Sequence, residues 1–251
     1  MDELEVLERY VKESLAMGCQ GLSHLDTALG RESYRRKAES VAARLAPGSS
    51  ILDWGCGYGQ MSFFLRNRGF RVIAYSVENP EPNPWNHMLR GLGFSVVYSR
   101  EPVALPFERG SFDAALACGV LEHVQDEEGS LRELARVLRP GGLLFVFMHP
   151  NRFSCTEFLA RWLFRMDFHE RRHTLGSLKE KLSGAGFEPV GMRYSQMFPR
   201  NFSFLPGRLR RAATGSPALL LAADDLLSRI PLLQMLSGTL EGVFMKKEER
   251  G

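Results

Sequence analysis

The feature that most constrains the fold is a glycine-rich turn between an apolar run and a helical pattern. Residues 50–54 (SILDW) follow the turn formers Pro47 and Gly48 and predict a buried strand. The sequence Gly-Cys-Gly-Tyr-Gly follows at 55–59, and a helical pattern then continues to Arg68. Glycines at such a junction let a ligand approach the backbone, and the helix start offers unpaired N–H groups. The turn therefore predicts a ligand site, with an ordinary tight turn as the plainer alternative.

The rest of the chain continues the alternation of strands and helices. Predicted strands cover residues 71–77, 95–99, 112–118 and 143–148, and predicted helices cover residues 1–46, 85–92 and 127–138. Further along, the pattern predicts a helix at 175–185, strands at 187–194 and 240–245, and at least one helix within 195–238. Strands that alternate with helices predict βαβ units, a mainly parallel sheet and helices on both of its faces.

Composition and charge narrow the class of protein. The 251 residues are 44% hydrophobic and 24% charged, as in soluble globular proteins, which excludes disordered and collagen-like chains. The net charge of +3 is too small for a chain that binds nucleic acid through its whole surface. Residues 151–211 nevertheless hold twelve Arg and Lys against five Asp and Glu, a basic segment on an otherwise mildly acidic body.

Cysteine usage and hydropathy indicate a cytoplasmic protein. The four cysteines form no C-x-x-C pair, so we expect reduced thiols rather than disulfides or a zinc site. The acidic N-terminal sequence, MDELEVLERY, does not resemble a signal peptide. Residues 217–236 form the nearest candidate for a membrane span, but they carry Asp224, Asp225 and Arg229 and are not expected to cross a membrane.

The glycine turn and four later segments together resemble one enzyme family. The dinucleotide fingerprint G-x-G-x-x-G/A fails, because Gln60 stands at the third glycine. The turn resembles instead motif I of the class I S-adenosylmethionine (SAM) dependent methyltransferases, of the small-molecule, type 11-like kind. Later motifs of that family are matched in order by Leu105-Pro-Phe, Gly110-Ser-Phe-Asp113, Val120-Leu-Glu-His-Val124 and LRELARVLRPGG at 131–142.

The fold and the domain organisation follow from this resemblance. It implies a Rossmann-like, doubly wound α/β sheet of about seven mostly parallel strands, with an N-terminal helical cap and a C-terminal helical insertion. The chain would be a single methyltransferase domain, in which residues 1–46 form the cap and residues 47–150 the SAM-binding core. Residues 151–251 would hold acceptor-side insertions and the last strands.

SAM is the cofactor that the resemblance implies, and its contacts carry over residue by residue. The methionine part would lie against Asp53 and four residues of the glycine turn, namely Gly55, Cys56, Gly57 and Gly59. Glu101 falls at the position of the family's adenine-contacting acid. Gly119 and Val120 fall in the turn that usually touches the sulfonium region.

Two positions depart from the family pattern. Ser76 stands where the family has its ribose-binding acid, and Glu78, two residues on, could take that role from the same face of the strand. Pro102 stands where a backbone N–H commonly binds adenine, and proline has no N–H to donate. A catalytically silent SAM-fold binding protein is therefore the alternative to a methyltransferase. A nucleotide-binding oxidoreductase is disfavoured by Gln60 and by the motif series.

Histidines supply the candidate catalytic groups, because methyl transfer needs a positioned acceptor and a base for its proton. His123, beside Glu122 after the fourth strand, is the predicted base, with a structural hydrogen bond to the backbone as the alternative. His149 follows the fifth strand at the edge where open α/β sheets bind ligands, but a loop residue before Pro150 is the favoured interpretation. His169 and His173 could share a helical face, but a solvated basic segment is favoured over a metal site, so no metal is expected.

The acceptor and the partners are less constrained. The predicted reaction is methylation, most often at oxygen, of a small-molecule or a lipid- or glycan-linked acceptor. Aromatic residues and arginines interleave within 151–173, and three interpretations stay open: a lid over the acceptor, a membrane-surface patch or a partner-binding face. Peripheral membrane contact through residues 151–211 is a hypothesis, and a nucleic-acid substrate is disfavoured.

Overall fold

The computed structural model describes residues 2–77, 85–164, 169–199, 202, 208 and 214–248. Glu78 and the proline-rich connector that follows it lie outside the described residues, as do Arg165 and Phe168 of the basic segment. The helices are α1 (Glu3–Ala16), α2 (Ala28–Ala42), α3 (Gln60–Arg66), α4 (Trp85–Gly91), α5 (Glu127–Val137), α6 (Cys155–Phe164), α7 (Leu175–Gly184) and α9 (Pro217–Leu227), with 3-10 turns η1 (Gln20–Leu25) and η2 (Leu233–Leu236).

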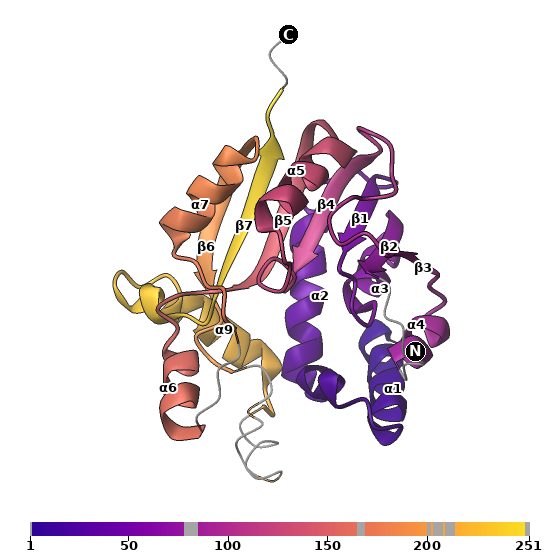
Figure 1. The fold of residues 1–251 in the computed structure, drawn as a ribbon. Coiled ribbons are helices and arrows are strands. Elements are labelled where there is room, and N and C mark those ends of the chain that lie inside the picture. The colour runs from indigo at the N-terminus through magenta and orange to yellow at the C-terminus, as the bar shows by residue number, and fades with distance from the viewer. Residues whose placement is uncertain are drawn as a thin grey trace.

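Seven strands form one sheet, in the order β3-β2-β1-β4-β5-β7-β6 (Figure 1). Their bounds are β1 (Ser50–Trp54), β2 (Arg71–Val77), β3 (Val96–Ser99), β4 (Phe112–Cys118), β5 (Leu138–Pro150), β6 (Phe187–Ser195) and β7 (Thr239–Lys246). The first five strands pair in parallel, and β7 runs antiparallel between β5 and β6. The expected doubly wound, mostly parallel α/β sheet of seven strands is therefore confirmed.

Helices cover both faces of the sheet, because successive side chains of a central strand point in opposite directions (Figure 1). On β1, Ile51 packs into a core with α1, α2 and α3, whereas Leu52 packs into a second core with α5 and α7. Both side chains are fully buried. This burial on both faces explains why the parallel strands are short, almost continuous apolar runs.

The predicted and observed elements differ most at the junction of α5 and β5. The pattern predicts a helix over 127–138 and a strand over 143–148, but α5 ends at Val137 and β5 starts at Leu138. Leu138 pairs with Phe112 of β4, and the register shifts before Ala114 pairs with Leu143. A bulge therefore accommodates the Pro-Gly-Gly sequence within the strand, where local sequence alone indicates a break.

A buried ion cluster attaches the N-terminal helices to the antiparallel end of the sheet. Glu241 on β7 lies 3.0 Å from the ammonium of Lys37 on α2 and 2.7 Å from the guanidinium of Arg193 on β6. Burial by itself would raise the pKa of Glu241, but the two cations lower that pKa to about 2. Because this is below the value of a free glutamate, the ion cluster stabilises the fold above about pH 4. That contribution is lost as the pH falls through the folded pKa of about 2.

We expect Glu241→Gln to lower the free energy of unfolding by about 3 kcal/mol at pH 7, because it leaves Lys37 buried without its counter-charge. Glu188→Gln, on an exposed position of β6, is the matched control and should change stability by less than about 0.5 kcal/mol. Urea unfolding of the three proteins measures both effects. Equal stability of the wild type and Glu241→Gln would show that the cluster is not a stabilising contact.

Candidate functional site

The candidate site lies at the carboxyl ends of β1 and β4, where the chain order of the sheet reverses direction. From β1 the sheet continues to β2 on one side and to β4 on the other. Ligands bind at this switch point in open α/β sheets, because the two connections leave in opposite directions and open a crevice. Both segments predicted to contact the cofactor, the glycine turn after β1 and the Gly119–Val120 turn after β4, meet there. A Cβ added to Gly55 would come within 2.6 Å of Val120.

Backbone hydrogen bonds hold the glycine turn against β2. The N–H groups of Gly55 and Cys56 both donate to the carbonyl oxygen of Tyr75, at 2.9 and 3.0 Å. Gly55, Gly57 and Gly59 all have positive φ angles, a conformation that favours glycine. A Cβ at Gly59 would also collide with Leu89 of α4, at 2.6 Å. Two of the three glycines are therefore required by the protein's own packing.

Gly57 differs from its neighbours because a Cβ there would meet no heavy atom of the described residues within 4 Å. Its φ of +53° still favours glycine. The side of the turn at Gly57 therefore faces open space directly before the start of α3 at Gln60. An open backbone beside a helix N-terminus is the cradle that a bound cofactor with charged groups needs. The predicted SAM site thus has a place for its ligand.

Asp53 lies beneath the turn as a buried acid. Its side chain is 1% exposed and accepts a hydrogen bond of 2.5 Å from the Ser62 hydroxyl on α3. Burial raises the pKa of Asp53 to about 6, although the hydrogen bond from Ser62 acts in the opposite direction. The contact ties β1 to α3 and so fixes the shape of the turn between them. Asp53 therefore stabilises the turn through its hydrogen bond with Ser62.

The other predicted cofactor residues lie around the same edge. Cys56 is buried, and burial raises the pKa of its thiol. Ser76 is half-buried and follows Tyr75, the residue whose carbonyl oxygen anchors the turn. Glu101 is exposed just after β3, and its N–H donates to the Ser99 hydroxyl. Glu78, the proposed substitute for the missing ribose-binding acid, lies outside the described residues.

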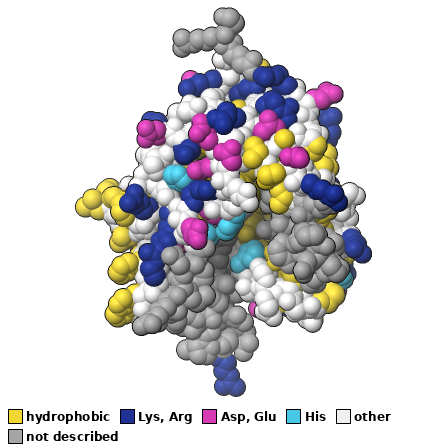
Figure 2. Space-filling model, viewed as in Figure 1, with side chains coloured by type: hydrophobic (Ala, Val, Ile, Leu, Met, Phe, Trp, Pro, Cys, Tyr) yellow, Lys and Arg dark blue, Asp and Glu magenta, His cyan; other side chains and the backbone are white. Residues whose placement is uncertain are grey.

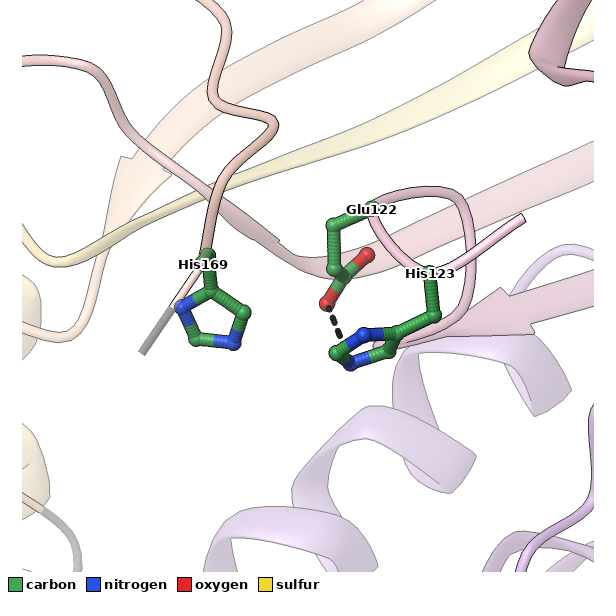
Figure 3. A group of neighbouring side chains, drawn as sticks. All are labelled: Glu122, His123 and His169. Atoms are coloured by element: carbon green, nitrogen blue, oxygen red, sulfur yellow. Dashed lines mark ion pairs between the residues drawn. The ribbon is translucent and has the colours of Figure 1, made fainter. Parts of the chain in front are cut away.

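Acidic and histidine side chains gather next to the Gly119–Val120 turn, and Figure 2 shows histidines near the middle of the corresponding face. His123 is largely exposed, and its Nε2 lies 4.0 Å from Glu122, whose side chain is only 2% exposed. The backbone N–H of His123 donates to the carbonyl oxygen of Val120. The ring of His169 lies 5.7 Å from that of His123. Figure 3 shows Glu122 and His123 on one loop and His169 on a separate segment facing them.

A second, buried row of side chains continues from Glu122 into the protein. His149 is 1% exposed, and its two ring nitrogens lie 3.6 Å from Glu122 and 2.7 Å from His173. His173 in turn lies 3.7 Å from Glu127. Burial and the neighbouring His149 lower the pKa of His173. The row joins the loop after β4 to the start of α5.

Two interpretations of the histidines are therefore wrong. His149 belongs to β5, not to a loop, and a register shift between β5 and β7 next to it turns its ring inward. His169 and His173 do not share a helix, and His173 is mostly buried rather than solvated. Sequence reasoning also missed Glu122, although the Leu-Glu-His-Val motif contains it. The feature that marks Glu122 is its contact with His149, which the sequence does not show.

A cavity of about 240 Å³ opens elsewhere, between α2, β6 and α9. Its polar lining includes Lys37, Arg193 and Asp224. Lys37 and Arg193 are the cations of the buried ion cluster with Glu241. The cavity does not include the glycine turn or His123, so we place the cofactor site by the turn geometry.

Comparison with known proteins identifies the class to which this site belongs. A family profile described as a methyltransferase domain matches residues 52–146. A sarcosine/dimethylglycine N-methyltransferase of Halorhodospira halochloris is 28% identical, over 76% of this chain and 70% of its own length. A ubiquinone biosynthesis O-methyltransferase of Methylocella silvestris is 40% identical, over 43% of this chain. The chain covers only 42% of the length of that second relative.

Solved structures share the fold over most of the chain. A 1,6-didemethyltoxoflavin-N1-methyltransferase of Burkholderia thailandensis, solved with S-adenosylhomocysteine, has a TM-score of 0.55 and 20% identity. The match covers 97% of this chain and 88% of that one. The 4+2 cyclase SpnF has a TM-score of 0.58 and 24% identity, over 86% and 81% of the two chains.

The sheet order, the glycine turn and these similarities define a SAM-binding protein of the Rossmann-like class. Residues 52–146 carry a SAM-dependent methyltransferase domain, and SAM is the cofactor of that domain.

We expect Gly57→Asp to weaken SAM binding by about 100-fold or more, because the side chain enters the open space at the turn. Gly48→Asp is the matched control, since Gly48 also has a positive φ and open space around its Cβ but lies before β1, at its other end. Calorimetric titration with SAM, together with thermal melts of both variants, separates binding from folding. Wild-type affinity in Gly57→Asp would show that the cofactor lies elsewhere.

Proposed function

We propose that this protein transfers the methyl group of SAM to an oxygen atom of a small-molecule acceptor, which can also be lipid- or glycan-linked. The observation that carries the proposal is the position of His123. It lies three residues after Val120, at the same edge of the sheet as the glycine turn, and its side chain is largely exposed. SAM supplies an electrophilic methyl group when it is bound.

We assign proton transfer to His123 and Glu122, and cofactor binding to the residues of the two turns and to Glu101. His123 takes the proton that the acceptor hydroxyl releases. The buried carboxylate of Glu122, 4.0 Å away, stabilises the imidazolium that results. For the cofactor, we propose that Asp53, Gly55, Cys56, Gly57 and Gly59 hold the methionine part and Glu101 the adenine. Gly119 and Val120 would face the sulfonium region.

Similarity to an N-methyltransferase and to an O-methyltransferase supports a small acceptor. Sarcosine and dimethylglycine N-methylation and ubiquinone O-methylation are named for the two relatives. An oxygen acceptor is favoured because the shorter match, to the O-methyltransferase, has the higher identity of 40%.

The second candidate is a SAM-fold protein that transfers no methyl group. Ser76 stands where an acid would bind the ribose, and Pro102 offers no N–H to the adenine. The fold is shared with SpnF, which is described as a cyclase. Cofactor affinity is the property that separates the two candidates.

Titration with SAM and with S-adenosylhomocysteine should show binding in the micromolar range, about −8 kcal/mol. His123→Ala should leave SAM affinity unchanged and lower the rate of methyl transfer by about 10²- to 10⁴-fold, because it removes the base. The rate is followed as S-adenosylhomocysteine release with a panel of phenols, catechols and sugar hydroxyls. A cooperative melt without SAM binding would favour the silent candidate.

We also propose that one edge of the molecule contacts a membrane surface. On α6, Phe158, Leu159 and Trp162 share one side of the helix and are 72, 51 and 73% exposed. The turn after α9 presents Leu232, which is 81% exposed and has an unfavourable φ of +68°. We call these residues, together with Phe153 and Ile230, the apolar edge.

Contacts between the two segments support a single surface. The side-chain amide of Asn151 donates to the carbonyl oxygens of Met235 and Ser237, which joins the approach to α6 with the turn after α9. Exposed arginines accompany the apolar edge at positions 152, 161 and 229, and Figure 2 shows cations between hydrophobic side chains along that side. Aromatic and leucine side chains beside cations are typical of surfaces that bind anionic lipid. None of the described helices is long and apolar enough to span a bilayer.

The protein should sediment with anionic phosphatidylglycerol vesicles and much less with neutral phosphatidylcholine vesicles. Replacing Phe158 and Trp162 together with serine should lower vesicle partitioning by about tenfold or more, because two large apolar side chains no longer enter the interface. Met17→Ser is the matched control, an exposed apolar side chain after α1. Equal sedimentation with both lipids, or no effect of the double variant, would contradict the proposal.

A further inference from the structure

Glu122, His123 and His169 bring three potential metal ligands together at the end of β4. One ligand atom from each side chain lies within 4.8 Å of the other two. The three residues come from two separate segments, and Figure 3 shows the carboxylate and the two imidazoles facing a common space. Two histidines and one carboxylate are a frequent ligand set of zinc in sites that keep an open coordination position.

The orientation of His169 is set by a second carboxylate. Its Nδ1 lies 2.6 Å from Glu157 of α6, which directs the opposite ring nitrogen, Nε2, away from that contact. Arg172 lies 3.3 Å from the same carboxylate and holds it in place. Metal-binding histidines commonly donate their other N–H to a carboxylate in this way, because the contact fixes the tautomer and makes the ligand more basic.

The state of Glu122 is a second, independent observation. Its side chain is 2% exposed, and its Oε2 accepts no hydrogen bond from any described residue. Its Oε1 lies 4.0 Å from Nε2 of His123, and its Oε2 lies 3.6 Å from Nδ1 of the buried His149; both distances are longer than hydrogen bonds. Burial of a carboxylate without hydrogen bonds is costly unless a positive charge compensates it. A cation at Oε1, between Glu122 and the imidazoles of His123 and His169, would supply that charge.

We propose that Glu122, His123 and His169 bind a divalent metal ion of the zinc type, oriented by Glu157. Ligand atoms around zinc lie about 2.0–2.2 Å from the ion, so the cluster has to contract by about 1 Å per side chain. The exposed ring of His123 is free to make that movement, whereas Glu122 is held by burial. From sequence alone, His169 is weighed together with His173 for a metal site, whereas this cluster joins His169 to Glu122 and His123.

Such an ion would define the class of acceptor, an inference that rests on the proposed methyl transfer to oxygen. A Cβ on Gly119 would lie 3.6 Å from Glu122, so the metal would lie beside the turn that faces the methyl donor. A hydroxyl bound at the open coordination position would lose its proton to solvent water more readily, because the cation would stabilise the oxyanion. Phenols and vicinal diols are the hydroxyl acceptors that fit this chemistry. The same nitrogen of His123 cannot bind the metal and act as base.

Metal binding is tested directly, on tag-free protein without SAM. Calorimetric titration with Zn²⁺ should show one ion per chain, and Co²⁺ should give the visible absorption bands of a four-coordinate site. His169→Ala and Glu122→Gln should abolish both signals, and Glu157→Gln should weaken zinc binding by about 10- to 100-fold. His87→Ala is the matched control, because His87 pairs with Glu13 on α1, away from the site. SAM titration of each variant reports whether its fold is intact.

Zinc binding that survives in His169→Ala and Glu122→Gln, or that is lost equally in His87→Ala, would overturn the proposal. Absence of zinc binding in a protein that binds SAM and methylates acceptors would overturn it too, while the proposed function would stand with His123 as the base. Zinc binding without methyl transfer to any hydroxyl acceptor would instead contradict the proposed function alone. If both hold, chelation should lower the transfer rate and leave SAM affinity unchanged.

Discussion

The pairing of β1 with both β2 and β4 is the constraint on which the rest of the structure depends. It places the turn after β1 between two parallel strands, and Tyr75 of β2 fixes that turn through two backbone hydrogen bonds. It also brings Val120 so close to Gly55 that no side chain fits at that glycine. The cofactor cradle is therefore a consequence of sheet order, since a different neighbour on either side would open or close the turn.

The acidic and histidine side chains are the second organising feature, and they give the site its chemistry. Glu122 contacts both the exposed and the buried histidines, because it lies between His123 and His149. The buried row continues to His173 and ends near Glu127 at the start of α5. This arrangement places an exposed histidine and a buried carboxylate side by side at the end of β4. Substitutions at two of these residues are expected to have non-additive effects on stability, because the side chains contact one another.

Local sequence predicted the central sheet well because buried parallel strands leave a strong signal. The strands at 50–54, 71–77 and 112–118 were confirmed with the expected bounds, since each is an apolar run between turn residues. The same reasoning failed at Leu138, where pairing with Phe112 begins the strand earlier than the helical pattern indicates. It failed again at His149, because a register shift rather than a residue pattern turns that ring inward. The roles assigned to Glu101 and His123 remain predictions.

The sequence by itself determined the positions of β1, β2 and β4 and the glycine turn, because these depend on residues that are neighbours in the chain, and its motif series indicated the class of cofactor. Tertiary structure alone decided which acids meet which histidines. His149 and His173 are 24 residues apart, and His169 reaches Glu157 from a different segment. No local pattern encodes such contacts, since they arise from the order of strands in the sheet and from the helices packed at its edge. The chemistry of the site is thus a property of the fold.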